Sequence, residues 1–223
     1  MSLSYEVVAA GGWAKTAARR IGEALPESGS VGLTGGSTAR AVYRLLAVSD
    51  SDWSGLEVLF SDERCVPPDH PESNFRIADE LLLRTCRPRA IHRMRGEDDP
   101  EAAASAYHDE IAGTVATGID LLLLGMGADC HIGAMFPDSP ALAEGDRLCA
   151  AVDRPDGMSG LTLTPPAILS AKRILLLVTG ESKVGAVARV LRSTDEVRSC
   201  PARLLAAHGG ATFLLDDAAA AEL

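Results

Sequence analysis

Residues 119–137, IDLLLLGMGADCHIGAMFP, decide the fold that we expect for this chain. The stretch begins with an apolar run, 119–124, which only Asp120 interrupts, and it has the length of a strand and the composition of one covered on both faces. A glycine-rich turn with Asp129 and His131 follows at once. A buried strand that ends in a polar turn is typical of an open parallel sheet, where ligands bind beyond the carboxyl ends of the strands.

The same alternation of short apolar runs and amphipathic segments extends in both directions along the chain. It predicts further strands and helices. The strands are expected at 31–34, 56–60, 174–179 and 211–215, and the helices at 9–24, 38–48, 73–84, 100–111 and 183–191. Segment 62–72 contains three prolines and is predicted to be a loop. We therefore expect one domain, residues 1–223, with an α/β, Rossmann-like three-layer fold: a mostly parallel sheet with helices on both faces.

Composition argues against several classes of protein. The 223 residues are 47% hydrophobic and 23% charged, as in globular chains. The chain has no apolar run near the roughly 18 residues of a membrane helix, and its first residues lack the pattern of a secretory signal. We therefore expect a cytoplasmic protein without membrane contact. The net charge of −10, from 21 basic and 31 acidic residues, argues against a nucleic-acid partner.

The cysteines favour reduced thiols. There are five of them, an odd number, and they include no C-x-x-C pair. This pattern suits neither a disulfide framework nor a zinc site.

The turn after the predicted strand 31–34 has the features of an anion site. Gly35, Gly36 and Ser37 lead directly into a predicted helix. Paired glycines allow close approach of the backbone, and a helix start offers free N–H groups and the positive end of a dipole, which suit phosphate. The alternative is a tight strand-to-helix turn capped by serine.

Charged side chains stand at two other strand ends. Asp62, Glu63 and Arg64 follow the predicted strand 56–60. Arg64 suits a bidentate contact with phosphate and Asp62 suits sugar hydroxyls, although a surface salt-bridge cluster is the alternative. Lys183, one of only three lysines, lies where a helix is expected to begin. A cation is disfavoured there by the helix dipole, which indicates an anionic ligand; simple exposure is the alternative.

His131 is the strongest candidate for proton transfer. A single histidine is more often structural than catalytic, but this one lies in a glycine-rich turn at a strand end, two residues after Asp129. An imidazole with a pKa near 6.5 suits general acid–base catalysis at neutral pH. The other four histidines, at 70, 92, 108 and 208, lack such a setting and are expected on the surface or in loops.

Together these segments resemble the 6-phosphogluconolactonase family, which belongs to a wider group that includes glucosamine-6-phosphate deaminase. The resemblance covers nearly the whole chain. Its motifs are GGST at 35–38, DERCVP at 62–67, LGMGADCHIGAMFP at 124–137, LTLT at 161–164, VTGESK at 178–183 and PA at 201–202.

The resemblance implies hydrolysis of 6-phospho-D-glucono-1,5-lactone to 6-phospho-D-gluconate in the pentose phosphate pathway, without metal or cofactor. His131 would be the base that activates water, and Asp129 would orient its ring. Backbone N–H groups of the glycine-rich turn would stabilise the oxyanion. The substrate-binding residues would be Gly35, Gly36, Ser37, Asp62, Arg64, Gly127 and Lys183.

Two positions depart from the family pattern. Cys130 stands where the family has glycine, and Gly160 stands where it usually has an arginine thought to bind phosphate. The sequence leaves open whether Arg154 or another arginine takes over. Two other functions remain open: a deaminase-like isomerase, whose pattern has Glu at Phe136 and Tyr at Arg64, and a sugar-phosphate-binding protein without catalysis. The sequence does not indicate an oligomeric state.

Overall fold

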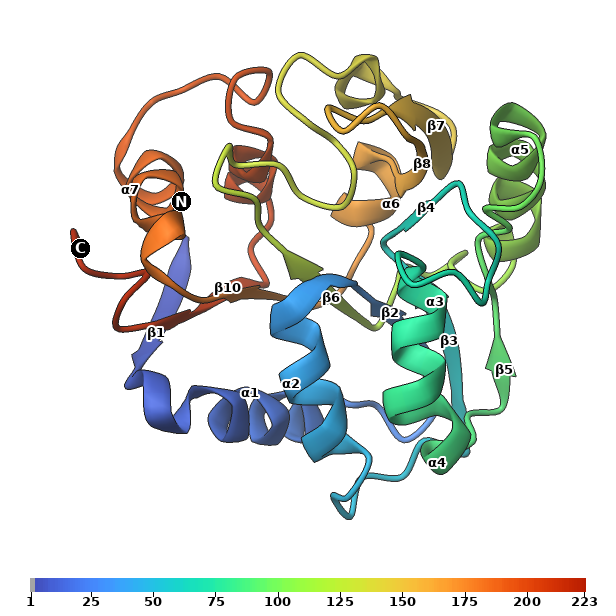
Figure 1. Cartoon of the computed structure of the whole chain (residues 1–223), viewed down its shortest axis with the longest axis horizontal. Coiled ribbons are helices and arrows are strands. Elements are labelled where there is room, and N and C mark those ends of the chain that lie inside the picture. The colour runs from blue at the N-terminus through green and yellow to red at the C-terminus, as the bar shows by residue number, and fades with distance from the viewer. Residues whose placement is uncertain (1–2) are drawn as a thin grey trace.

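A parallel sheet runs through the middle of the molecule (Figure 1). The computed structural model describes residues 3–223. The sheet has seven strands in the order β1-β10-β9-β6-β2-β3-β5, and every neighbouring pair is parallel. The strands are β1 (Ser4–Val8), β2 (Gly29–Leu33), β3 (Leu56–Phe60), β5 (Ala90–Ile91), β6 (Leu121–Gly125), β9 (Ile174–Val178) and β10 (Ala211–Asp216). The predicted α/β fold with a mostly parallel sheet is confirmed.

The strand order places a switch point between β2 and β6. From β2 the chain continues to β3 and β5 on one side, whereas β6, β9 and β10 follow one another on the other side. The loops after β2 and β6 therefore lead away from each other and leave a crevice at the carboxyl ends of these strands. Ligands bind at such switch points in open α/β sheets.

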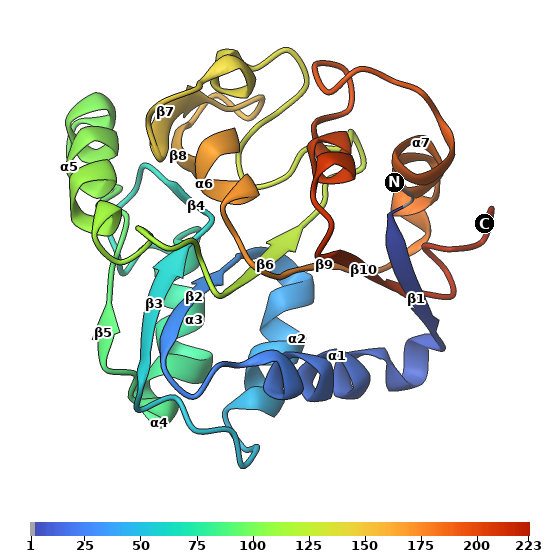
Figure 2. The ribbon, with the colours of Figure 1, turned by 180° about the vertical axis from the view of Figure 1, so that it is seen from behind.

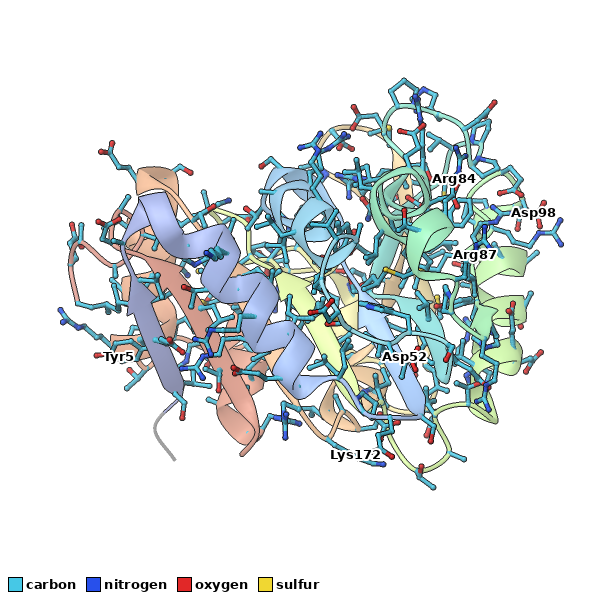
Figure 3. All side chains as sticks on the ribbon, turned by 90° about the horizontal axis from the view of Figure 1, so that it is seen from below. Tyr5, Asp52, Arg84, Arg87, Asp98 and Lys172 are labelled. Carbon is cyan, nitrogen blue, oxygen red and sulfur yellow. The ribbon has the colours of Figure 1, made fainter. Side chains whose placement is uncertain are left out.

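Helices cover both faces of the sheet (Figures 1 and 2). As Figure 1 is drawn, the elements below the sheet are α1 (Ala10–Ala24), α2 (Gly36–Leu46), α3 (Asn74–Ala78), the π-helical turn η1 (Asp79–Leu83) and α4 (Arg84–Cys86). Above it lie α5 (Pro100–Ala112), α6 (Pro165–Leu169) and α7 (Val184–Arg192), with 3₁₀ turns at η2 (Pro140–Ala143), η3 (Glu181–Lys183) and η4 (Pro201–Ala207). Figure 3, seen from below, shows α1 across the lower face and Tyr5 on the edge strand β1.

A second, smaller sheet lies above the carboxyl ends of the main strands, on the side of β3 and β5 (Figure 2). Its antiparallel strands are β4 (Asp62–Arg64), β8 (Ser159–Leu163) and β7 (Cys149–Asp153), in the order β4-β8-β7. The prediction that 62–72 is a loop is therefore wrong for its first three residues. Polar residues form this strand because β8 pairs with them, with Asp62 opposite Thr162 and Arg64 opposite Gly160.

Tyr43 fixes the turn that leads from β2 into α2. Its ring is fully buried, and its hydroxyl donates to the Thr34 carbonyl at 2.5 Å while it accepts from the Thr34 N–H at 3.1 Å. A helix side chain thus satisfies the last backbone groups of a strand, which would otherwise be costly to bury. The turn at Gly35 is held in one place as a result.

The chain has no helix, within residues 3–223, that is long and apolar enough to cross a membrane.

Candidate active site

A cleft of about 360 Å³ opens at the carboxyl ends of β2, β6 and β9, against the small sheet. Eight of the nine predicted site residues line it. They are Gly35, Gly36, Ser37, Asp62, Arg64, Gly127, His131 and Lys183. The ninth, Asp129, is hydrogen-bonded to His131. Of the five histidines, all of which lie in the described part of the chain, only His131 lines the cleft.

His131 and Asp129 form a tight pair in the turn after β6. The Nδ1 atom of His131 lies 2.6 Å from Oδ1 of Asp129, which also accepts from the His131 backbone N–H at 3.2 Å. Partial burial raises the pKa of Asp129, but the hydrogen bond and charge of His131 lower that pKa by more, so the carboxylate stays ionised at neutral pH. An ionised carboxylate only accepts, so Nδ1 of His131 is the donor to it, and in the neutral tautomer Nε2 is then the nitrogen that can accept a proton.

Gly127 makes room for this pair. A Cβ atom at Gly127 would lie 2.1 Å from Nδ1 of His131 and 2.3 Å from Oδ1 of Asp129. The backbone N–H of Gly127 donates to the His131 carbonyl at 2.9 Å. This N–H is therefore engaged within the turn and is not free to donate to an oxyanion.

Cys130, which stands where the family pattern has glycine, adopts a left-handed backbone conformation. Its φ angle is 71°, in the left-handed region that non-glycine residues rarely adopt. Its thiol is fully buried, with Sγ 3.8 Å from the Ala186 carbonyl. The turn accommodates the cysteine without losing the adjacent His131–Asp129 contact.

Asp62, Asn74 and Arg64 form a hydrogen-bonded row along one wall of the cleft. The Nδ2 atom of Asn74 donates to Oδ2 of Asp62 and to its carbonyl, both at 2.9 Å, and Oδ1 of Asn74 accepts from Nη1 of Arg64. Asp62 is buried, which excludes the surface salt-bridge cluster considered above. The Arg64 guanidinium contacts only neutral oxygens, and its buried Nε has no partner among residues 3–223.

Glu63 holds the backbone of Arg64 and Asn74 in place. Its buried carboxylate accepts from four donors, the backbone N–H groups of Arg64, Asn74 and Phe75 and the hydroxyl of Ser73, at 2.7–2.9 Å. Burial raises the pKa of Glu63, and these hydrogen bonds oppose the rise only in part. The carboxylate ties β4 to the start of α3 and thereby positions Asn74 and Arg64.

The start of α2 lines the cleft next to this wall. Gly35, Gly36, Ser37 and Thr38 line it, and no side chain among residues 3–223 caps the helix. A Cβ atom at Gly35 would lie 1.7 Å from Oδ1 of Asn74, so only glycine allows this approach. The free N–H groups of the first turn and the helix dipole favour an anion.

Lys183 adds a further positive side chain to the lining of the cleft. It is the last residue of η3, and α7 begins one residue after it, at Val184. The loop after β9 is hydrogen-bonded to the start of α2: the hydroxyl oxygens of Thr179 and Thr38 lie 3.1 Å apart. Lys183 and the α2 N-terminus therefore line the same cleft from two neighbouring loops.

Twelve further lining residues were not among the nine predicted site residues, although Arg154 was named from the sequence as an arginine that could take over from position 160. They are Thr34, Thr38, Ala39, Asn74, Gly125, Met126, Gly133, Arg154, Leu177, Val178, Thr179 and Ser182. Most flank the predicted residues in the same strand-end loops, so the strand-end rule could have found them. Asn74 and Arg154 come from elsewhere, and only the three-dimensional fold brings them to the cleft. Within residues 3–223, no group of three or more His, Cys, Asp or Glu side chains is arranged to hold a metal ion.

The sequence profile described as glucosamine-6-phosphate isomerases/6-phosphogluconolactonase matches residues 6–214. The chain belongs to this family. A family relative from Synechocystis sp., described as a 6-phosphogluconolactonase, is 38% identical over 215 residues, covering 92% of this chain and 89% of the relative. A relative from Streptomyces coelicolor with the same description is 36% identical over 217 residues, covering 88% and 82%. The solved 6-phosphogluconolactonase of Trypanosoma cruzi superposes with a TM-score of 0.90 at 27% identity, covering 100% of this chain and 98% of the other.

Proposed function

We propose that this chain is a 6-phosphogluconolactonase, which hydrolyses 6-phospho-D-glucono-1,5-lactone to 6-phospho-D-gluconate in the pentose phosphate pathway. One observation carries the proposal. A histidine paired with a carboxylate lines the same cleft as an uncapped helix N-terminus, Arg64 and Lys183. A phosphorylated lactone needs both kinds of group: cations and free N–H groups to bind its phosphate, and a general base to activate water against its carbonyl. The family relatives described as 6-phosphogluconolactonases support the same substrate.

The phosphate binds between Arg64, Lys183 and the N–H groups of the α2 start. Arg64 already lies along the wall with an unpaired Nε, and its guanidinium offers a planar set of donors that matches phosphate oxygens. The buried Asp62 carboxylate faces the cleft next to Asn74 and accepts from sugar hydroxyls. These contacts orient the lactone carbonyl toward His131.

His131 acts as the general base. Its Nε2 takes a proton from water as the water oxygen attacks the lactone carbonyl and forms a tetrahedral intermediate. The intermediate then collapses, the bond to the ring oxygen breaks, and the same imidazole returns the proton to that oxygen. Asp129 stabilises the positive charge that His131 carries between the two steps. The reaction consumes one water, and its two proton transfers need only the His131 imidazole.

The two alternative functions fit the cleft less well. Phe136, which stands where the deaminase pattern has Glu, packs its ring 4.4 Å from the ring of His131 and brings no acid–base group. The retained His131–Asp129 pair argues against a binding protein without catalysis. We place the enzyme in the cytoplasm, where its five free thiols would stay reduced.

Turnover measurements test the proposal. The purified chain is incubated with freshly prepared 6-phosphogluconolactone, and the spontaneous opening of the lactone is subtracted. Ammonia release from glucosamine 6-phosphate is measured in parallel. We expect enzymatic turnover of the lactone and no ammonia. Deamination without lactonase activity would support the isomerase, and binding of 6-phosphogluconate without either turnover would support the non-catalytic protein.

Loss of either cleft cation is expected to weaken phosphate binding. We predict that Arg64→Ala and Lys183→Ala each raise the KM for the phosphorylated lactone by about ten- to a hundredfold, because each removes a charge-assisted contact. The KM for unphosphorylated gluconolactone should change much less. Equal losses on both substrates would show that these side chains serve the fold rather than the phosphate.

Replacing Cys130 by glycine is expected to keep or raise the kcat. Glycine adopts the left-handed conformation of residue 130 without strain, so the turn should retain the His131–Asp129 contact. The comparison needs kcat and thermal unfolding of both proteins. A large fall in kcat at unchanged Tm would show that the thiol itself positions His131.

A further inference from the structure

Arg154 brings a third positive side chain to the cleft, beside Arg64 and Lys183. It lies directly after β7 and begins the hairpin turn to β8, where its N–H donates to the Met158 carbonyl and its carbonyl accepts from the Gly157 N–H, both at 3.0 Å. An arginine in a surface turn is mostly exposed in folded proteins. Only 11% of this side chain is exposed, because it folds back from the turn toward the cleft.

Two neighbours hold the Arg154 guanidinium in place. Asp156 accepts from Nη2 at 2.8 Å and from Nε at 3.2 Å, and the guanidinium carbon lies 5.5 Å from the centre of the Phe136 ring. The Phe136 ring also packs against His131, at 4.4 Å between ring centres. Guanidinium has five N–H donors. Within residues 3–223 only those on Nε and Nη2 meet an acceptor, so the Nη1 donors remain for a ligand.

Gly160 provides the space that Arg154 occupies. A Cβ atom at residue 160 would lie 3.0 Å from Cδ of Arg154, 3.4 Å from its Cγ and 3.2 Å from the Glu63 carbonyl. Any side chain at 160 would therefore push Arg154 aside. In the small sheet Gly160 is also the register partner of Arg64. Arg154, packed on Gly160, thus lies on the Arg64 side of the cleft, where the proposed function places the phosphate.

We propose that Arg154, whose side chain passes over Gly160 into the cleft, binds the substrate phosphate. It thereby sets the preference of this enzyme for phosphorylated lactones. The arginine that the family pattern has at 160 is thereby supplied from the neighbouring strand. This inference rests on the proposed function for its substrate, but it makes a separate statement about one side chain. Arg154 and an arginine at 160 would compete for the same volume and would repel each other.

The experiment compares the wild type with Arg154→Ala, Arg154→Lys, Gly160→Arg and the double variant Arg154→Ala/Gly160→Arg. The KM and kcat are measured with 6-phosphogluconolactone and with gluconolactone, and the Kd of 6-phosphogluconate is measured by calorimetry. The control is Arg84→Ala, which removes a positive charge from α4, on the lower side of the molecule (Figure 3). Its exposed side chain pairs with Asp79.

We expect Arg154→Ala to raise both the KM for the phosphorylated lactone and the Kd of 6-phosphogluconate by about ten- to a hundredfold. The KM of Arg154→Ala for gluconolactone should change less than about twofold. In the control variant Arg84→Ala, the KM for either lactone and the Kd of 6-phosphogluconate should also change less than about twofold. Arg154→Lys should recover part of the loss because it restores the charge without the planar donors. Gly160→Arg alone should weaken binding, and the double variant should bind better than Arg154→Ala.

Two results would overturn the inference. An equal fall in kcat on both lactones would mean that Arg154 only supports the Phe136–His131 stack, and an unchanged KM and Kd would mean that it does not touch the phosphate. A wild type that hydrolyses neither lactone would count against the proposed function instead. Even then, a Kd of 6-phosphogluconate that depends on Arg154 would support the inference.

Discussion

Replacing His131 by alanine is expected to lower the kcat for 6-phosphogluconolactone by about 10²- to 10⁴-fold, the usual contribution of a positioned general base. The KM should change little, because the cations that bind phosphate are untouched. His131 is partly exposed and its ring packs on Phe136, so its loss should leave the fold intact. Initial rates corrected for spontaneous lactone opening, together with thermal unfolding, measure both effects.

The matched control is His92→Gln. His92 lies between Glu57 and Glu110 and does not line the cleft, so its replacement removes another imidazole without touching the proposed machinery. We expect this variant to keep the wild-type kcat. A His131→Ala variant with wild-type kcat would show that His131 is not the general base.

Replacing Gly127 by alanine is expected to lower kcat by about 10²-fold or more, toward the value of His131→Ala. A methyl group at 127 would lie 2.1 Å from Nδ1 of His131 and 2.3 Å from Oδ1 of Asp129. Both are ends of side chains, which rotate away more easily than backbone moves. The variant should therefore fold, with Tm lowered by less than about 4 °C, while the His131–Asp129 pair is broken.

Gly145→Ala is the control for Gly127→Ala. A Cβ atom at Gly145 meets no atom of residues 3–223 within 4 Å, so the same substitution has no steric consequence there. The double variant Gly127→Ala/His131→Ala gives a further check, since two changes that act on one group should not add. Losses that multiply in the double variant would show that Gly127 acts on catalysis by another route.

The main sheet could be predicted because its central strands are buried on both faces. β6 and β9 consist of apolar residues without interruption, apart from the final Gly125 of β6. The five missed strands, β1, β4, β5, β7 and β8, lack this pattern. β1 lies at an edge and exposes most of its residues, and β5 has only two residues. β4 consists of Asp62, Glu63 and Arg64, whose burial depends on hydrogen bonds from α3 that no local pattern reveals.

The candidate site could be predicted where it follows the strand-end rule. The turns after β2, β3, β6 and β9 supplied the nine predicted site residues. Eight of these residues line one cleft, and the ninth, Asp129, is hydrogen-bonded to His131 in it. Asn74 and Arg154 could not be assigned in this way. Asn74 reaches the cleft because buried Glu63 fixes the start of α3, and Arg154 reaches it because Gly160 on a neighbouring strand lacks a side chain. Both depend on contacts between segments that are distant in sequence.

A crystal structure with 6-phosphogluconate bound tests most directly the claim that one cleft holds the phosphate and presents the reacting carbon to His131. We predict that the phosphate contacts Arg64, Lys183 and the first N–H groups of α2, and that the carboxylate of the product lies within about 3 Å of Nε2 of His131. A phosphate bound beside His131, or a product bound outside the cleft lined by these residues, would contradict the account.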